Sequence, residues 1–340
     1  MPLSPISYLL SPISYLLSPI SYLLSPIRAM ASQQVQNGTM KHVWVVGSAN
    51  LDLVFRTAKF PKPGETLLGG PFASYPGGKG GNQAVAVGRL SGNVNFVGCV
   101  GMDSFGDSLA RSLAESGVKT DHLAHHRTSV TGTAAILVDD EGRNEIVVAP
   151  GANWEVTASQ VELALKNAGQ DPVLVQLEIP MEAVMAAASS STQLFLDPAP
   201  ARLLSPELLA RTFVITPNEV ETEALTGIQP ADIGSCRMAA GSLLDRGVEH
   251  VVIKLGEKGC FWMSATSEAL VPAPSVKPID TVAAGDVFNG GLAWFYASRR
   301  NWKNALELAN YAAALSVTKA GAQSSMPTLE ELRAFARDVF

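Results

Sequence analysis

Small residues precede Asp286 within residues 280–290, where the chain reads DTVAAGDVFNG. Phe288, Leu292 and Phe295 follow at the spacing of a buried helix, so we expect Asp286 in the first helical turn, where the helix dipole favours a carboxylate. A helix start without bulky side chains leaves its N–H groups open to an anion. The segment therefore predicts a place where a phosphate meets a general base, although a capping aspartate on an ordinary helix has the same local pattern.

Carboxylate and amide side chains in two further segments are suited to binding a sugar. Asn50 and Asp52 follow an apolar run, and glycines flank Lys79 in the segment 77–83, GGKGGNQ, which leads into a predicted helix. Sugar hydroxyls both donate and accept hydrogen bonds, so they need an acceptor such as Asp52 beside amides that do either. The glycine segment lacks the GxxxxGK[ST] spacing, which excludes a P-loop. A flexible turn and an ordinary strand-end aspartate are the structural alternatives.

Two segments after later apolar runs are candidates for contacts with a nucleotide. Asn218 and Glu221 stand three residues apart at a predicted helix start, which places both on one face, where they can orient phosphates through a water-bound Mg²⁺. The same pair makes an equally good capping box. The segment 254–259, KLGEKG, has two glycines that let the backbone approach a ligand, but a hairpin turn has the same composition.

Six short apolar runs, separated by helical patterns, must position these groups. Continuous apolar strands that alternate with helices are typical of a parallel sheet covered on both faces. Ligands bind such sheets beyond the carboxyl ends of the strands, so we predict an α/β fold in which the polar residues after the strands share one edge. The runs are residues 42–47, 93–98, 173–177, 194–197, 213–216 and 250–254, and the polar residues are Asn50, Asp52, Glu178, Asp197, Asn218 and Gly256.

Two stretches depart from this alternation of strands and helices. Residues 53–74 carry Pro61, Pro63 and a Gly-Gly pair between short β-prone runs, and residues 133–148 read as a hairpin that turns at 140–142. Together they predict a small sheet that projects over the site as a lid. Its apolar face needs a partner, and a second copy of the chain in a homodimer is the simplest one.

The composition limits the partners and the compartment. Charged residues are 16% of the chain, the net charge is −6, and no basic tract occurs, which argues against nucleic acid and against an anionic membrane surface. The three cysteines are far apart and lack the spacing of a disulfide framework or a zinc site. We therefore expect a cytoplasmic protein in a reducing environment.

A seven-residue unit, LSPISYL, occurs three times and begins a fourth within residues 1–30. Its leucines and isoleucines have heptad-like spacing, but the proline in every unit costs a helix about 3 kcal/mol, which argues against a coiled coil. A basic start and an unbroken apolar core are missing, so no secretory signal is expected. We predict a disordered extension over residues 1–40 and one large domain over 41–340. The many serines and the lack of acidic residues also fit a transit peptide, which would place the protein in an organelle.

From Lys41 to Phe340 the chain resembles the ribokinase-like, or pfkB-type, carbohydrate kinase family. Two family signatures carry the resemblance: the glycine-rich segment 77–82 and the segment 280–286, in which most members have glycine where Ala283 stands. Further family-like segments occur in the right order, and several spaced motifs together are more specific than any one of them. These segments are GSANLD at 47–52, DPAPA at 197–201, TPNE at 216–219 and GAQSS at 321–325.

The resemblance implies a three-layer α/β/α sandwich with a mostly parallel central sheet and a small β-sheet lid. It also implies ATP-dependent phosphorylation of the 5-hydroxyl of D-ribose, giving ribose 5-phosphate and ADP. Asp286 would accept the hydroxyl proton as the oxygen attacks the γ-phosphate, while the N–H groups of Ala283, Ala284, Gly285 and Asp286 stabilise the developing charge. At Asp197 the chain departs from the family, in which asparagine is common.

The resemblance also assigns binding positions, carried over residue by residue. The sugar positions are Asn50, Asp52, Gly78, Lys79, Asn82, Glu178 and Asp286. The nucleotide positions are Asn218, Lys254, Leu255, Gly256, Glu257, Lys258, Gly259, Gly285 and Asn310, with Glu221 near Mg²⁺ through water. Oxygens of Asp280, Val282, Ser316, Lys319, Gly321 and Ser325 would form a site for K⁺.

Several other activities share parts of this pattern. A fructokinase, an adenosine kinase or a keto-sugar acid kinase of the same family would have the same core motifs, and Phe55 and Arg56 leave an aromatic or basic lid contact open. A non-catalytic sugar-binding regulator would normally lack the base or the glycine of the anion site, and Asp286 and Gly285 are both present. A dehydrogenase is disfavoured because no GxGxxG follows the first apolar run.

Overall fold

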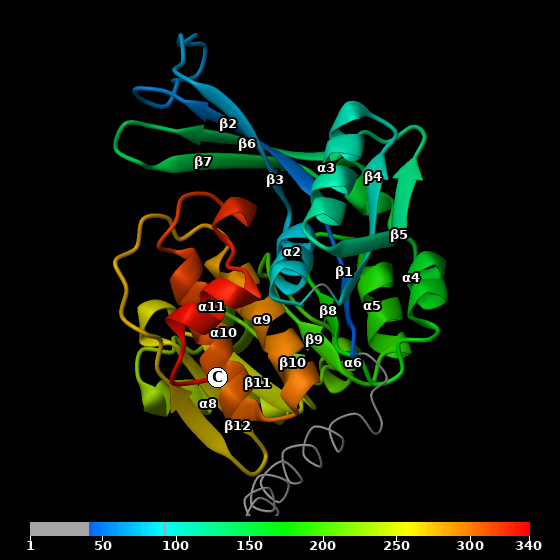
Figure 1. Cartoon of the computed structure of the whole chain (residues 1–340), viewed down its shortest axis with the longest axis vertical. Helices are drawn as coiled ribbons and strands as arrows, with labels where there is room; N and C mark the ends of the chain where they lie inside the picture. The colour runs from blue at the N-terminus through cyan, green and yellow to red at the C-terminus, as the bar shows by residue number, and fades with distance from the viewer. Residues whose placement is uncertain (1–40, 92) are drawn as a thin grey trace, which may run out of the picture. The chain divides into compact units, whose positions relative to one another are not determined.

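The computed structural model describes residues 41–91 and 93–340, which fold around two β-sheets (Figure 1). The extension predicted over residues 1–40 lies outside the described residues. The larger sheet has nine strands and the smaller has four. Within the described part of the chain, no helix is both long enough and apolar enough to span a bilayer.

The nine-stranded sheet is parallel except at one edge. Every neighbouring pair from β5 to β11 runs parallel, whereas β12 and β13 pair antiparallel beyond β11. The mostly parallel sheet predicted from the sequence is therefore confirmed. In spatial order the strands are β13 (Glu268–Val271), β12 (Cys260–Ser264), β11 (His250–Lys254), β10 (Val214–Ile215), β9 (Leu194–Leu196), β8 (Val173–Val175), β1 (Val43–Val46), β4 (Val94–Gly101) and β5 (Val118–His126).

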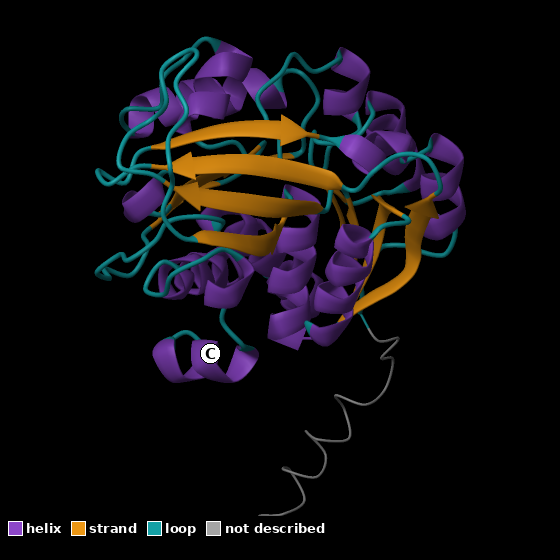
Figure 2. Cartoon of the chain, turned by 90° about the horizontal axis from the view of Figure 1, so that it is seen from above, coloured by secondary structure: helices purple, strands orange, loops and turns teal. Residues whose placement is uncertain are grey.

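Successive residues of β1 pack on opposite faces of this sheet. Val43 and Val45 belong to one buried core, and Trp44 and Val46 belong to the other. A strand that is apolar at every position needs cover on both sides, and Figure 2 shows helices above and below the strands. The first core is covered by α2 (Lys79–Ser91), α3 (Ser104–Glu115), α9 (Ala284–Arg299), α10 (Trp302–Ser316) and α11 (Leu329–Phe335), and the second by α4 (Ala158–Leu165), α5 (Met181–Ser190), α6 (Pro206–Ala210), α7 (Glu219–Thr226) and α8 (Ile233–Leu244). Short 3-10 helices lie at η1 (Gly151–Glu155), η2 (Gly256–Lys258) and η3 (Gln323–Ser325).

The six apolar runs each contain one parallel strand, but the three strands at the sheet edges were not predicted. β5 and β13 alternate buried or half-buried residues with exposed ones, because an edge strand is only partly covered. β12 follows β11 in a hairpin, and the sequence pattern did not distinguish this strand from the turn before it. A search for continuous apolar runs therefore finds the centre of such a sheet and misses its margins.

The smaller sheet joins two distant parts of the chain. Its β2 pairs antiparallel with β3 and parallel with β6, and β6 forms an antiparallel hairpin with β7 within the segment where a hairpin was predicted. In Figure 1 this sheet projects from the body of the molecule above the orange and red helices. Its strands are β3 (Phe72–Gly77), β2 (Asn50–Arg56), β6 (Gly132–Val138) and β7 (Asn144–Ala149).

Strand β2 carries Asn50 and Asp52 directly into the small sheet. The sequence placed these residues after the first strand, and only residues 47–49 separate them from β1. The first residues of β2 therefore lie at the carboxyl edge of the central sheet, while the rest of the strand extends away from it (Figure 1). This arrangement makes the base of the small sheet one wall of the predicted site.

Candidate active site

Asp286 is the third residue of α9 and lies in its first turn, as predicted. The residue before the helix, Ala283, has a φ of 61°, a left-handed conformation that favours glycine. The N–H of Ala284 donates to the carbonyl oxygen of Thr281 at 3.3 Å. Among the hydrogen bonds of the described residues, none uses the N–H groups of Ala283, Gly285 or Asp286. Three of the four N–H groups expected to bind an anion are therefore open in this conformation.

Gly285 leaves space in front of this helix start. A Cβ built on Gly285 would meet the ammonium nitrogen of Lys254 at 3.7 Å, which is an ordinary contact. Packing against the described residues does not require glycine at this position. An anion that approaches the free N–H groups does require it, because a side chain would stand in its way.

Two amides of α2 hold the carboxylate of Asp286. Asn82 Nδ2 donates to Oδ2 at 2.9 Å, and Gln83 Nε2 donates to Oδ1 at 3.1 Å. Asn82 is fixed in turn by Gln323, whose Nε2 donates to Asn82 Oδ1 at 3.1 Å. A Cβ on Gly290 would lie 2.7 Å from the carbonyl oxygen of Gln83, so glycine lets α9 approach α2 closely enough for these bonds. The carboxylate is thus held in one orientation.

The ionisation of Asp286 is set mainly by its burial, which raises its pKa to about 6. The Lys79 ammonium lowers the pKa, the Asp197 carboxylate raises it, and the bonds from Asn82 and Gln83 lower it. Because the side chain is only 7% exposed, burial has the larger effect. A carboxylate with this pKa is ionised near neutral pH and still binds a proton readily, as a general base must.

A second carboxylate, Asp52, faces Asp286 from the small sheet. Burial raises the pKa of Asp52 to about 7, and the charges of Glu178 and Asp286 add to this effect. A Cβ on Gly77 would lie 2.2 Å from Asp52 Oδ2, so only glycine leaves room for the carboxylate here. Three acidic groups are therefore crowded at one place, which costs stability unless a ligand or cation offsets their repulsion.

The other sugar positions lie at the same wall. Asn153 Nδ2 donates to Asn50 Oδ1 at 2.7 Å, which orients the Asn50 amide. Gly78 has a φ of 81°, and a Cβ there would lie 2.7 Å from the backbone nitrogen of Asn50. Glu178 Oε2 accepts a hydrogen bond from Ser48 Oγ at 2.5 Å. The structure thus places the polar residues after β1 and β8 beside the start of α2.

Lys79 is the cation among these carboxylates. Its backbone N–H donates to Glu178 Oε2 at 3.0 Å. Burial alone would lower the pKa of the Lys79 ammonium, but the charges of Asp286, Asp197, Glu178 and Glu221 outweigh burial and raise it. Lys79 therefore stays charged and offsets part of the negative charge of the site.

On the nucleotide side, Asn218 and Glu221 form the capping box that was the structural alternative for this pair. Asn218 N donates to Glu221 Oε2 at 2.8 Å, and Glu221 N donates to Asn218 Oδ1 at 2.8 Å. Among the described residues, no hydrogen bond uses Glu221 Oε1. One carboxylate oxygen is thus part of the cap, and the other has no partner.

The remaining predicted nucleotide positions include the turn between β11 and β12 and Asn310 of α10. Residues 254–259 form the turn of an antiparallel hairpin, again the structural alternative, with Lys254 paired to Cys260 across it. Asn310 Nδ2 donates to the carbonyl oxygen of Val271 at 3.0 Å, so the Asn310 amide fastens α10 to the edge strand β13. Its amide oxygen, not its nitrogen, is the group left for other partners.

Asp280 connects the two loops of the predicted K⁺ site. Its Oδ1 accepts from the N–H of Val282 at 3.0 Å, and its Oδ2 accepts from the N–H of Gly321 at 2.9 Å. The hydroxyls of Ser316 and Ser325 each donate to a nearby backbone carbonyl, so their lone pairs remain open. Carboxylate and hydroxyl oxygens are of the type that a hard cation prefers.

The ammonium of Lys319, another residue of the predicted K⁺ set, lies 2.6 Å from Glu331 Oε1 in a surface ion pair. Only the backbone of Lys319 is therefore suited to the predicted site. Over residues 41–91 and 93–340 there is no group of three or more His, Cys, Asp or Glu that could hold a metal ion. The predicted K⁺ and Mg²⁺ positions would therefore depend on backbone oxygens, hydroxyls and single carboxylates.

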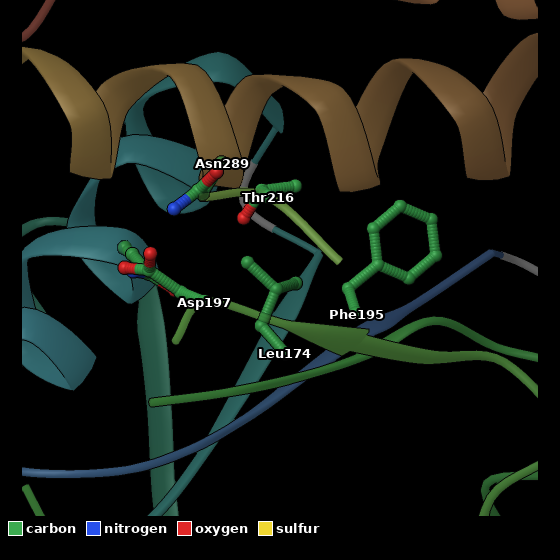
Figure 3. A pocket seen from close by; sticks show the side chains of 6 residues that line it. Leu174, Phe195, Asp197, Thr216 and Asn289 are labelled. Carbon is green, nitrogen blue, oxygen red and sulfur yellow. The ribbon is translucent and has the colours of Figure 1, made fainter. Parts of the chain in front are cut away.

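Several residues of the site were not predicted from the sequence. Gln83 was part of a quoted motif without a role, yet its Nε2 donates to Asp197 Oδ2 at 2.9 Å as well as to Asp286, and its Oε1 accepts from Gln176 Nε2 at 2.6 Å. Asn289 lines the same small cavity as Asp197 (Figure 3). A glutamine inside an otherwise apolar run, as at Gln176, was the one available signal.

Comparison with known proteins places these features in one family. The family model described as pfkB family carbohydrate kinase matches residues 40–329. A ribokinase of Haemophilus influenzae is 41% identical over 300 residues, which cover 87% of this chain and 98% of that protein. The crystal structure of a ribokinase from Thermotoga maritima has a TM-score of 0.81 at 37% identity and covers 88% of this chain and 100% of its own. The structure of Arabidopsis thaliana ribokinase complexed with ribose and ATP has a TM-score of 0.80 at 28% identity and covers 87% of this chain and 99% of its own.

Proposed function

The chain belongs to the pfkB family of carbohydrate kinases, and from that premise we propose that it transfers the γ-phosphoryl group of ATP to the 5-hydroxyl of D-ribose. The products are ribose 5-phosphate and ADP. The observation that carries this proposal is Asp286, a buried carboxylate that faces a wall of sugar-binding groups and begins a helix with free N–H groups. The proposed general base, the proposed sugar-binding groups and the open N–H groups therefore lie at one place.

Asp286 acts as the general base. Its carboxylate takes the proton of the 5-hydroxyl while the hydroxyl oxygen attacks the γ-phosphorus and the bond to the β-phosphate oxygen breaks. The amides of Asn82 and Gln83 hold the carboxylate in the direction needed to receive that proton. The N–H groups of Gly285 and Asp286 lie at the helix start, where they stabilise negative charge on the transferred group.

Asn50, Asp52, Lys79 and Glu178 form the sugar wall, which supplies acceptors and donors for the other hydroxyls of ribose. Asp52 and Glu178 are acceptors, and the Asn50 amide and the Lys79 ammonium are donors. Because Asn50 and Asp52 belong to β2, their positions depend on the small sheet. Movement of that sheet over bound ribose would exclude water from the transfer step.

The nucleotide and its cations bind at the other side of Asp286. We propose that Asn218, the turn 254–259, Gly285 and Asn310 line the ATP site. Mg²⁺, when bound, neutralises phosphate charge and orients the γ-phosphate, and the unpartnered oxygen of Glu221 is suited to hold it through water. K⁺, when bound, would draw together the loops that Asp280 already connects, through oxygens of Asp280, Val282, Ser316, Lys319, Gly321 and Ser325.

A homodimer is proposed from the exposed side chains of the small sheet. Ile146 and Val148 of β7 are 53% and 48% exposed, and they lie on the same face of the sheet as Ile136. A four-stranded sheet of this kind is marginal unless its apolar face is covered. A second copy of the same sheet, related by a two-fold axis, is self-complementary and covers it.

The proposed domain division and location follow from the chain as a whole. We propose that residues 41–340 form the kinase domain and that residues 1–40 are separate from it. Cys99, Cys236 and Cys260 are free and buried, which supports a reducing compartment such as the cytoplasm. An organelle is the alternative, and fractionation of cells that express the tagged full chain decides between the two.

A coupled assay of ADP release tests the proposed function. The purified chain is incubated with ATP and Mg²⁺ and with D-ribose, 2-deoxyribose, fructose, adenosine or a keto-sugar acid in turn. The proposal expects the highest kcat/KM for D-ribose. Turnover that is higher for another acceptor contradicts ribose as the substrate, and ribose binding without turnover on any acceptor favours a sugar-binding regulator.

A further inference from the structure

A buried ion pair joins two strand ends beside the proposed base. Lys254 Nζ, at the end of β11, lies 3.1 Å from Oδ1 of Asp197, just after β9, and the side chains are 14% and 5% exposed. The backbone fixes both residues, since Lys254 N donates to the Pro217 carbonyl at 2.8 Å and Asp197 N donates to the Val175 carbonyl at 2.9 Å. Lys254 begins the turn proposed to line the ATP site, but no contact of either side chain with a substrate has been described so far.

Asp197 is linked to the base through a shared amide. Gln83 Nε2 donates both to Asp197 Oδ2, at 2.9 Å, and to Asp286 Oδ1, at 3.1 Å. Gln176 fixes this amide from behind with a bond of 2.6 Å to Gln83 Oε1. A change in the partner of Asp197 therefore alters the hydrogen bonding of the Gln83 amide next to Asp286.

Lys254 also borders the anion site. Its ammonium nitrogen is 3.7 Å from the position that a Cβ on Gly285 would occupy. That position lies in front of the free N–H groups at the start of α9. The ammonium is thus close enough to reach an anion bound there by a small rotation of its side chain.

An unused donor lies on the other side of Asp197. Asn289, one turn after Asp286 in α9, is 2% exposed, and neither its amide nitrogen nor its amide oxygen has a partner among the described residues. Asn289 and Asp197 line the same small cavity, and in Figure 3 the Asn289 nitrogen is turned toward the Asp197 carboxylate. A buried amide without partners is costly, so a second arrangement that uses it is favoured.

We propose that Lys254 leaves Asp197 for the terminal phosphates of bound ATP, and that the Asn289 amide then donates to Asp197 in its place. In the free protein Asp197 neutralises the ammonium. In the complex the phosphates neutralise the Lys254 ammonium, and the buried Asp197 carboxylate accepts a hydrogen bond from the Asn289 amide in its place. This inference rests on the proposed function in that the ligand is a nucleoside triphosphate. Lys254 and Asn289 are then positioning residues for ATP, and Asp197 weakens its binding.

Two probes separate contact with the terminal phosphates from other effects. Isothermal titration measures the affinity of the full chain for β,γ-imido-ATP with Mg²⁺ and for AMP, which lacks the terminal phosphates. Asp197→Asn releases Lys254 and carries the residue common in the family, so binding of the triphosphate analogue should tighten by about fivefold or more. Adding Lys254→Met to that variant should weaken analogue binding by about tenfold or more, the effect of losing a charge-assisted hydrogen bond. AMP binding should stay unchanged in both.

Lys254→Met is tested in the Asp197→Asn variant, because Lys254→Met alone leaves the buried Asp197 carboxylate unpaired and can unfold the protein. Asn289→Leu should weaken analogue binding in the wild-type background and leave it unchanged beside Asp197→Asn, where no buried charge needs the amide. Lys303→Met, at an exposed position in the first turn of α10, is the control for loss of one positive charge. Its affinities should equal those of the wild type.

Two results overturn the inference. Equal analogue affinity in Asp197→Asn and in its Lys254→Met double variant shows that the ammonium does not contact the phosphates. Weaker analogue binding in Asp197→Asn shows that Asp197 positions Lys254 and does not compete for it. Neither titration contains ribose, so a failure of ribose phosphorylation with the expected affinities leaves this inference standing and contradicts the proposed function alone.

Discussion

Asn82 and Asp286 are 204 residues apart in the sequence, and the amide nitrogen of Asn82 lies 2.9 Å from a carboxylate oxygen of Asp286. Asn82 lies in the glycine-rich segment and in the first turn of α2, and Asp286 lies in the first turn of α9, at the predicted anion site. The bond therefore joins the two signatures of the family at the reacting position. It makes the direction of the base depend on the same helix that begins the sugar wall.

The left-handed conformation of Ala283 has a measurable cost. An alanine with a φ of 61° is less stable than glycine by about 1 kcal/mol. We expect Ala283→Gly to raise the melting temperature by roughly 2 °C. The control is Ala297→Gly in the interior of the same helix, which should lower it, because glycine is unfavourable there. A melting temperature that falls in both variants contradicts the strain at Ala283.

The raised pKa of Asp52 predicts how stability changes with pH. A carboxyl whose pKa rises from 3.8 to about 7 on folding stabilises the free protein fully below pH 4, and this contribution is lost as the pH rises through 7. We expect Asp52→Asn to leave the melting temperature at pH 4.5 nearly unchanged and to raise stability at pH 8 by on the order of 2 kcal/mol. Scanning fluorimetry from pH 4.5 to 8 measures this difference. An equal effect at both ends of the range would show that burial and the neighbouring carboxylates do not raise the pKa of Asp52.

The oxygen-rich loops around Asp280 predict activation by K⁺. We expect rates in K⁺ buffer to exceed those in Na⁺ or Tris buffer at equal ionic strength, because the cation would order the loop before the anion site. Asp280→Asn should lose this difference, since the amide cannot supply the carboxylate charge. Equal wild-type rates in the three buffers count against a functional cation site.

The small sheet predicts a link between assembly and ribose binding. Ile136 pairs with Val54 and with Ile146, on the same face of the sheet as Asp52. We expect Ile136→Asp to yield monomers and to weaken ribose binding together, as measured by light scattering and titration. Val147→Asp, on the opposite face, is the matched control and should remain dimeric. A wild-type chain that is monomeric at micromolar concentration and fully active contradicts the dimer.

The sequence was sufficient for the fold class and for the start of α9, because both depend on local patterns. The apolar runs and the small residues before Asp286 are visible in one stretch of chain each. The contacts of Asp197 were not visible, because its partners Gln83 and Lys254 are 114 and 57 residues away and only the order of the strands brings them together. For Asn218 and Glu221 the sequence offered a capping box and a nucleotide site equally, and the structure shows the capping box.

The role of Asp286 is tested most directly by the turnover of Asp286→Asn with D-ribose and ATP. Asparagine keeps the size of the side chain and can still accept a hydrogen bond, but it cannot accept the proton. We expect kcat to fall by on the order of 10²–10⁴-fold, while titration shows ribose binding largely intact. A variant that keeps more than about half of the wild-type kcat would contradict a general base at Asp286 and, with it, the proposed mechanism.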